Sequence, residues 1–298
     1  MVSLGMFDGV HLGHQAILEA NAARARELGA RSTVVTFRRH PKKLLLGNAP
    51  RTLTTLEHRL ELFSRAGIEH AAVLNFDSSL RALTAAEFTE EIAVRRLGVR
   101  RFVLGFDSKF GRDRGGTPEF LRSRGFEVDI APKVVVAGRA VSSTAIREAV
   151  ELGDLASASA MLGRPVSVFG RVVRGSSLGQ RLGFPTANLD LHHELHPPPG
   201  VYACLAHHLP RSEPRRTYRG VTNIGFRPTV AAEPPRLPQV EVHLLDFEGD
   251  LYGERMELEF VARLRGERRF AGIDELTDQI GKDVLQARGI LERLPPGG

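Results

Sequence analysis

The sequence predicts an α/β domain with a parallel sheet, followed by an antiparallel β domain that ends in a long helix. Three observations support this fold class: strands and helices alternate up to about residue 150, strands then follow one another across Gly and Pro turns, and one long amphipathic segment closes the chain. Strand-helix alternation is typical of parallel sheets covered on both faces, whereas consecutive strands are typical of barrels and sandwiches. With 298 residues the chain is long enough for two domains.

In the first half, β-branched runs mark the strands and capping residues mark the helices. Strands are predicted at 32–37, 71–76, 101–106 and 128–130. Thr54 with Glu57, and Thr84 with Glu87, have the spacing of capping boxes before amphipathic stripes. Because parallel sheets bind ligands at the carboxyl ends of their strands, we expect this half to bind a nucleotide there.

A helical stretch over 145–162 separates the halves; it is broken at Gly153-Asp154 and ends at the stop signal Gly163-Arg164-Pro165. Beyond it, strands are predicted at 166–173, 201–206, 240–245 and 256–261, and a helix at about 274–294. The expected first domain, helical linker and second domain are 1–150, 151–163 and 164–298.

Composition limits the classes of partner. The formal charge of +6 favours anionic ligands, but aromatic residues are only 6% of the chain and tryptophan is absent, so nucleotide phosphates are expected rather than nucleic acid. The single cysteine, Cys204, lies in an apolar run and is predicted to be a buried strand residue. Since no bilayer-length apolar stretch and no charged-then-apolar leader is present, we expect a cytoplasmic protein without a membrane partner.

The segment 5–14, GMFDGVHLGH, follows the first strand and leads into a helix. His11 and His14 are three residues apart and therefore lie on one side of the helix entrance. Free N-H groups and the helix dipole favour phosphate there, and imidazoles can donate to oxygens that gain charge in phosphoryl-type transition states. A surface or structural pair of histidines is the alternative.

A second motif opens another helix. In SSTAIR, residues 142–147, hydroxyls stand at capping positions and Arg147 lies on the first turn, which suits a triphosphate. A plain Ser/Thr cap with a solvated arginine is the alternative. Together, the two motifs resemble the nucleotidyltransferase superfamily, whose HIGH-type and SST-type motifs bind ATP from two sides.

The second half offers a candidate metal loop and a candidate base. In GQRLGFPTANL, residues 179–189, a Gly/Pro loop presents Thr186 and Asn188, neutral oxygen donors that suit Mg²⁺ shared with phosphates. A turn feeding a strand is the alternative. Strand alternation places Glu241 and His243 on one face, so Glu241 could act as a general base for a hydroxyl; a solvated strand face is the alternative.

Across nearly its whole length, the chain resembles the prokaryotic bifunctional riboflavin kinase/FAD synthetase family. The motifs that carry the resemblance are, in order, GMFDGVHLGH, TFRRHP, GFDSKFG, SSTAIR, GQRLGFPTANL, PPPGVYA, GVTNIGFRPT, VEVHLLDFEGDLYG and QIGKD. The resemblance implies a Rossmann-like nucleotidyltransferase domain and a six-stranded riboflavin kinase barrel with a C-terminal helix. It also implies ATP with Mg²⁺ in both reactions, and riboflavin and then FMN as the small-molecule acceptors.

Site residues follow from the same resemblance, position by position. It implies Mg²⁺ binding by Thr186 and Asn188, and deprotonation of the ribityl 5′-hydroxyl by Glu241. It implies stabilisation of the α-phosphate by His11 and His14 while FMN attacks. The implied ATP-binding residues are Gly5, Phe7, Asp8, Gly9, Ser143, Thr144 and Arg147, and the implied flavin-binding residue is Asp107.

The chain departs from the family's usual pattern at three places. Arg38-Arg39 replaces an acidic residue and a proline, Ser108-Lys109 replaces an aromatic-basic pair, and relatives carry a further short lead. The alternative function is therefore riboflavin kinase alone, with an inactive nucleotidyltransferase-like domain that forms no FAD. A basic RNA- or protein-binding module is an alternative from another class, which the scattered charge disfavours. The oligomeric state is open, a homo-oligomer included.

Overall fold

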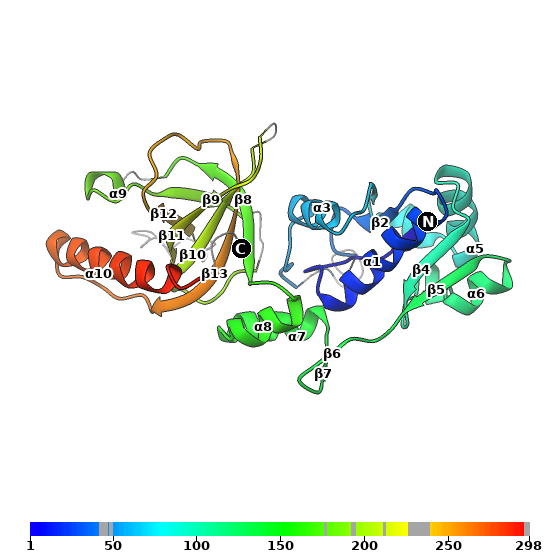
Figure 1. Cartoon of the computed structure of the whole chain (residues 1–298). Helices are drawn as coiled ribbons and strands as arrows, with labels where there is room; N and C mark the ends of the chain where they lie inside the picture. Colours follow the sequence, from blue (N-terminus) through cyan, green and yellow to red (C-terminus); the bar gives the residue numbers. More distant parts are fainter. Residues whose placement is uncertain are drawn as a thin grey trace. The chain divides into compact units, whose positions relative to one another are not determined.

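The protein is described by a computed structural model that covers residues 1–41, 47, 50–175, 178–191, 195–210, 213–225 and 239–294 (Figure 1). It divides into two compact units: Met1–Ile146 with Met161–Gly163, and Arg147–Ala160 with Arg164–Gly298. Within the described ranges, no helix combines the length and the apolarity needed to span a bilayer.

The first unit is built on a five-stranded parallel sheet with the order β3-β2-β1-β4-β5. Its strands are β1 (Val2–Leu4), β2 (Thr33–Phe37), β3 (His70–Leu74), β4 (Arg101–Gly105) and β5 (Glu127–Ala131). The strands expected at 32–37, 71–76, 101–106 and 128–130 are thus confirmed within two residues at each end. The chain order reverses between β1 and β4, so their carboxyl ends border the crevice where such sheets bind ligands.

Helices cover both faces of this sheet. They are α1 (Leu12–Glu27), α3 (Leu56–Arg65), α4 (Ser78–Ala82), α5 (Ala85–Phe88), a π-helical segment (Thr89–Arg96), a 3₁₀ turn (Arg112–Arg114) and α6 (Pro118–Ser123). Neighbouring residues of β2 face opposite ways: Val34 packs with α1 and α3 in one apolar cluster, and Val35 packs with α5 and α6 in the other. A small hairpin of β6 (Val135–Val136) and β7 (Arg139–Ala140) precedes α7.

One predicted helix cap is confirmed and the other is wrong. Thr84 and Glu87 form the expected capping box at α5. At α3, however, the cap is Thr55, whose hydroxyl accepts from the backbone N-H of His58, and not Thr54. The hydroxyl of Thr54 instead accepts a hydrogen bond from Gly9 in the loop after β1. This tertiary contact, which the local pattern does not show, explains why Thr54 does not cap the helix.

The second unit contains a closed six-stranded antiparallel barrel with the order β10-β11-β12-β9-β8-β13 (Figure 1). Its strands are β8 (Ser167–Val173), β9 (Ala187–Asp190), β10 (Gly200–His208), β11 (Arg216–Gly225), β12 (Gln239–Leu244) and β13 (Arg255–Arg265). The helices outside the barrel are α9 (Leu178–Arg181) and α10 (Ile273–Leu291), together with α7 (Ser143–Leu152) and α8 (Leu155–Leu162), whose residues are divided between the two units. The predicted break at Gly153-Asp154 separates α7 from α8. Within the GVTNIGFRPT motif, residues 226–229 lie outside the described residues.

Helix α10 packs on the outer surface of the barrel. Val201 and Ala203 of β10 contact Ala287 and Leu291 of α10. Because side chains alternate along a strand, Tyr202 and Cys204 point to the barrel interior, where both are fully buried. Cys204 is therefore a core strand residue, as predicted.

We expect the Cys204 thiol to be inert in the folded protein. Its Sγ lies 2.9 Å from Thr222 Oγ1, and burial raises the pKa of Cys204 to about 12. At pH 8 the reactive thiolate is then about a thousandfold rarer than in the unfolded chain. Labelling with a thiol-specific disulfide reagent should be at least about 100-fold slower in buffer than in urea. Equal labelling rates in buffer and in urea would contradict the burial of Cys204. The Cys204→Val variant has no thiol and therefore gives the background signal of the reagent.

Candidate active sites

The loop between β1 and α1 has an unusual backbone. Phe7, Gly9 and Val10 have positive φ angles of 52°, 83° and 39°. For Phe7 and Val10 such angles cost about 1–3 kcal/mol each, which their nearly complete burial among α1 and α3 offsets. At Gly9 a Cβ would also lie 2.7 Å from Leu53 Cδ1, so both the backbone angle and the available space require glycine.

Distant residues hold this loop in place. The Gly9 N-H donates to Thr54 Oγ1 over 3.0 Å, and the Thr54 N-H donates to Asp8 Oδ1 over 3.2 Å. The Ser143 hydroxyl, at the start of α7, donates to the Asp8 backbone oxygen over 2.9 Å. Asp8 is only 2% exposed, so its carboxylate shapes the loop from within.

Arg59 of α3 ties the same loop to the end of β2. Its Nη1 donates to the Met6 oxygen over 2.6 Å, and its Nη2 donates to the Phe37 oxygen over 3.0 Å. Burial lowers the pKa of Arg59, while the charge of Asp8 acts in the opposite direction. A buried guanidinium thus joins the carboxyl ends of two neighbouring strands.

The two predicted histidines meet at the N-terminus of α1. Their rings are stacked, with centroids 3.6 Å apart and planes 18° apart. His11 is the N-cap, and its Nδ1 accepts from the His14 N-H over 3.4 Å. Phe7 packs edge-on against His14 at 5.2 Å. The stack stands where the helix dipole and its free N-H groups attract an anion.

The remaining predicted residues of this half lie around the same end of the sheet. Asp107 is exposed just after β4, whose carboxyl end neighbours that of β1 because Val2 pairs with Phe102. Thr144 is exposed on the first turn of α7, next to Ser143, and Gly5 follows β1 directly. Arg147 lies one turn further along α7 and is counted with the second unit.

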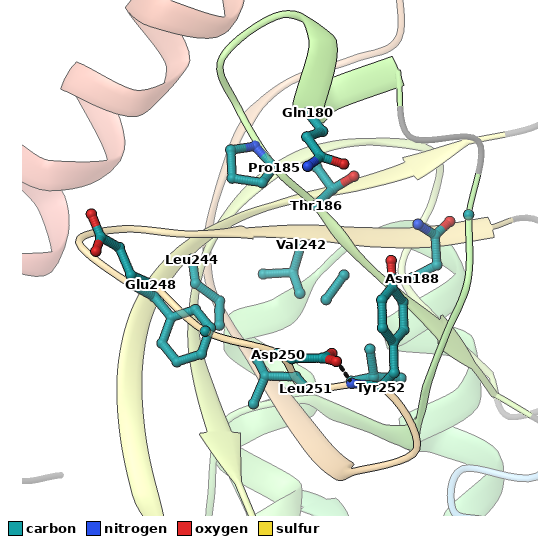
Figure 2. A pocket seen from close by; sticks show the side chains of 15 residues that line it. Gln180, Pro185, Thr186, Asn188, Val242, Leu244, Glu248, Asp250, Leu251 and Tyr252 are labelled. Atoms are coloured by element: carbon teal, nitrogen blue, oxygen red, sulfur yellow. Dashed lines mark hydrogen bonds between the residues drawn. The ribbon is translucent and has the colours of Figure 1, made fainter.

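Figure 2 shows a pocket of about 510 Å³ in the barrel unit, lined by the predicted metal ligands Thr186 and Asn188. Val242 and Leu244 of β12 form one wall, and the segment that contains Tyr252 forms another. The backbone of Gly175 lies so close to the Asn188 amide that a Cβ there would clash with it. The chain thus forms a narrow cradle around one of the two candidate ligands.

A second pocket, of about 360 Å³, lies between the outer barrel surface and α10 and contains Glu241 and His243. Its apolar wall is formed by Leu182, Phe184, Phe270, Leu276, Ile280 and Val284. Thr186 lines both pockets. Glu241 is paired directly with Asn188 across β12 and β9, a position that brings Cβ atoms to about 5 Å. The candidate base and both candidate metal ligands therefore stand where the two pockets meet.

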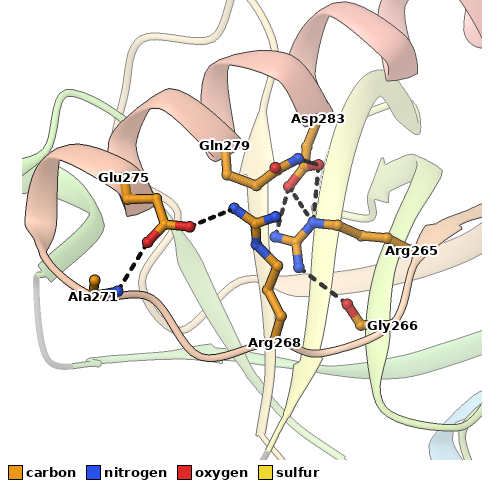
Figure 3. A network of polar contacts seen from close by, with 7 residues as sticks. All are labelled: Arg265, Gly266, Arg268, Ala271, Glu275, Gln279 and Asp283. Carbon is orange, nitrogen blue, oxygen red and sulfur yellow. Dashed lines mark hydrogen bonds and ion pairs between the residues drawn. The ribbon is translucent and has the colours of Figure 1, made fainter.

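Arginine–carboxylate pairs fix the rim of the second pocket (Figure 3). Arg265, at the end of β13, holds both oxygens of Asp283 on α10 at 2.8–3.0 Å, and Gln279 donates to Asp283 over 2.8 Å. Arg268 pairs with Glu275 at 3.0 Å and lies 4.6 Å above the Phe270 ring. The QIGKD motif contains Gln279 and Asp283, but sequence reasoning missed their pairing with Arg265, because nothing in the local pattern links a strand end to a helix 18 residues later.

The described ranges contain no group of three or more His, Cys, Asp or Glu side chains that could hold a metal ion. Thr186 and Asn188 nevertheless fit Mg²⁺, since both carry the oxygen donors that this ion takes, and Mg²⁺ fills much of its shell with water and substrate phosphates. Both face the same pocket, which leaves room for a polyphosphate.

The fold and the two sites define a two-domain nucleotide-dependent transferase. Residues 1–145 match the FAD synthetase family, and residues 162–291 match the riboflavin kinase family. The chain is 40% identical over 294 residues to the bifunctional riboflavin kinase/FMN adenylyltransferase of Pseudomonas fluorescens, covering 97% of this chain and 92% of that protein. It is 36% identical to the Bacillus subtilis enzyme of the same name, covering 96% and 91%. The chain belongs to the family of bifunctional riboflavin kinases/FMN adenylyltransferases, whose two domains both use ATP.

One solved structure has the same architecture over almost the whole chain. It is a crystal structure from Streptococcus pneumoniae, described as a macrolide-efflux protein, with 32% identity, a TM-score of 0.79 and coverage of 96% of this chain and 93% of that one. Because both enzymatic domains match their families, the kinase-only alternative is not favoured.

Thr54→Val should impair FAD formation from supplied FMN by about 10-fold or more, because the Gly9 N-H loses its buried acceptor and the Asp8 carboxylate keeps only the hydrogen bond from the Thr54 backbone. Thr55→Val is the matched control: it removes the α3 cap at a similar cost of about 1 kcal/mol but leaves the loop bonded. Equal loss of FAD synthesis in both variants, measured by chromatography, would show that helix stability and not the loop contact matters.

Asp283→Leu should lower the unfolding free energy of the barrel by about 3–5 kcal/mol, because it leaves the mostly buried Arg265 guanidinium without its carboxylate partner. The double variant Arg265→Met/Asp283→Leu should recover most of that loss. All three tyrosines, Tyr202, Tyr218 and Tyr252, belong to the barrel unit, so tyrosine fluorescence in urea reports on it alone. A double variant as unstable as Asp283→Leu would contradict the pairing.

Proposed function

We propose that the barrel unit phosphorylates riboflavin where its two pockets meet, and that the α/β unit adenylylates the resulting FMN at the histidine stack. The observation that carries the kinase assignment is that Thr186 lines both pockets, while Asn188, two residues further on, is paired directly opposite Glu241. In this arrangement ATP occupies the pocket of about 510 Å³ and riboflavin the pocket of about 360 Å³. The apolar wall of the latter suits a flat aromatic ring system.

In the kinase reaction, Glu241 accepts the proton of the ribityl 5′-hydroxyl as this oxygen attacks the γ-phosphorus of ATP, and ADP leaves. Thr186 and Asn188 would hold Mg²⁺, which neutralises charge on the transferred phosphoryl group and the departing ADP. Glu241 is half-buried on a strand, so its carboxylate is held in position by the sheet and by the pocket around it.

In the adenylyl transfer, a phosphate oxygen of FMN attacks the α-phosphorus of ATP, and pyrophosphate leaves. His11 and His14 donate hydrogen bonds to the α-phosphate oxygens as negative charge grows on them. Gly5, Phe7, Asp8 and Gly9 shape the loop around ATP, Ser143, Thr144 and Arg147 hold its phosphates, and Asp107 contacts the flavin. The stacking of the two imidazoles at the helix N-terminus supports this assignment.

We also propose functional domains at 1–150 and 164–298, with a helical linker at 151–163. Riboflavin, FMN and ATP are the proposed partners, without nucleic acid or membrane, and the cytoplasm is the proposed compartment because it supplies ATP and keeps the lone cysteine reduced. A homo-oligomer is compatible with these assignments.

Chromatographic separation of flavins tests which unit carries out which reaction. With ATP and Mg²⁺, the unaltered protein should convert riboflavin to FMN and FAD. Glu241→Gln should lower FMN formation by about 10²-fold or more and spare FAD formation from supplied FMN, because only the proton acceptor is lost. His14→Ala should do the reverse. Loss of both activities in either folded variant would overturn the two-site assignment.

A further inference from the structure

His243 lies two residues after Glu241 on β12, on the same face of the strand, and lines the proposed riboflavin pocket. Its Nδ1 is 2.8 Å from the backbone oxygen of Pro185. Because a carbonyl oxygen can only accept, Nδ1 carries the proton in this contact. The imidazole also packs edge-on against Phe184, with ring centroids 5.6 Å apart and planes 85° apart.

This contact begins where the backbone pairing of β12 with β9 stops. The recorded pairs run from Val240–Leu189 through Glu241–Asn188 to Val242–Ala187. The next residue toward the loop is Thr186, and before it stands Pro185, which has no N-H to extend a ladder. The His243 side chain therefore joins β12 to the loop just beyond the last paired residues.

Among the described residues 178–185, the backbone hydrogen bonds of the loop before Thr186 are local. The Phe184 and Leu182 N-H groups both donate to the Gly179 oxygen, at 2.8 and 3.1 Å. These bonds give the loop its shape but do not fix it against β12. A rotation of the loop about Ala187 would move the Thr186 hydroxyl relative to Glu241, and the hydrogen bond from His243 opposes that rotation.

We propose that His243 is a positioning residue for the kinase reaction, whose hydrogen bond to Pro185 holds the Thr186 loop in register with the base Glu241. This inference rests on the proposed function of these two residues. The proton of Nδ1 and the geometry of the bond are what matter, so a side-chain amide that donates from a similar place should substitute for the imidazole, and an apolar side chain should not.

The test compares three variants of the full chain. His243→Asn retains a donor near the Nδ1 position, and His243→Leu retains bulk without a donor. His208→Leu is the matched control, because His208 is a histidine of the same barrel that bonds Glu254 at 3.2 Å and lines neither pocket. Amide hydrogen exchange over residues 178–187 is measured without ligands, and FMN formation is measured across a Mg²⁺ titration.

In His243→Leu, exchange over 178–187 should become about 3- to 10-fold faster, the range expected for loss of one hydrogen bond. Its kcat for FMN formation should fall by about 10- to 100-fold, with a higher half-saturating Mg²⁺ concentration. His243→Asn should lie close to the unaltered protein, His208→Leu should not differ from it, and all should convert supplied FMN to FAD normally.

Unchanged exchange together with an unchanged Mg²⁺ dependence in His243→Leu would overturn the proposal. So would a His243→Asn variant as impaired as His243→Leu, since the donor would then be irrelevant. These results leave the kinase assignment intact. An unaltered protein that forms no FMN would instead refute the proposed function, and the exchange measurement would still decide whether His243 anchors the loop.

Discussion

The pairing of β9 with β12 is the contact on which the proposed kinase site depends. β9 is only four residues long, yet its pairs with β12 close the barrel and bring Asn188 directly opposite Glu241. Because Thr186 immediately precedes β9, the same pairing brings it to the point shared by both pockets. The separation between the candidate base Glu241 and the candidate ligand Asn188 is therefore set by a backbone ladder, which tolerates far less variation than a loop contact would, whereas Thr186 lies one residue beyond the ladder.

In the α/β unit, the candidate site is built on a strained loop rather than on the face of a strand. Phe7 and Val10 adopt backbone angles that are unfavourable in isolation, and three remote residues, Thr54, Arg59 and Ser143, bond the loop. The strain persists because burial and these hydrogen bonds outweigh it, as strained loops at functional sites require. The glycine at position 9 and the histidine stack then stand at the sheet's reversal point, where helix α1 starts.

Local patterns are sufficient to predict much of the fold, whereas the roles of the candidate reacting groups follow from the resemblance to the family and stay predictions. The alternation along β12, the capping box at Thr84 and the burial of Cys204 are properties of a few adjacent residues, and all three are confirmed. Thr54 was misassigned because two successive threonines both fit a cap, and only the distant loop decides between them. β11 was not among the predicted strands, since Arg216–Gly225 mixes arginine and glycine into its apolar pattern. The two pockets and the Arg265–Asp283 pair depend on barrel closure, which no local pattern contains.

A crystal structure of the full chain with ADP, Mn²⁺ and riboflavin bound would test the proposed kinase site most directly. We expect ADP in the pocket of Val242 and Leu244, the metal on the oxygens of Thr186 and Asn188, and the ribityl 5′-hydroxyl within about 3 Å of Glu241. Riboflavin bound beside Val242 and Leu244, or a metal remote from Thr186, would contradict the claim that the two pockets meet at the reacting groups.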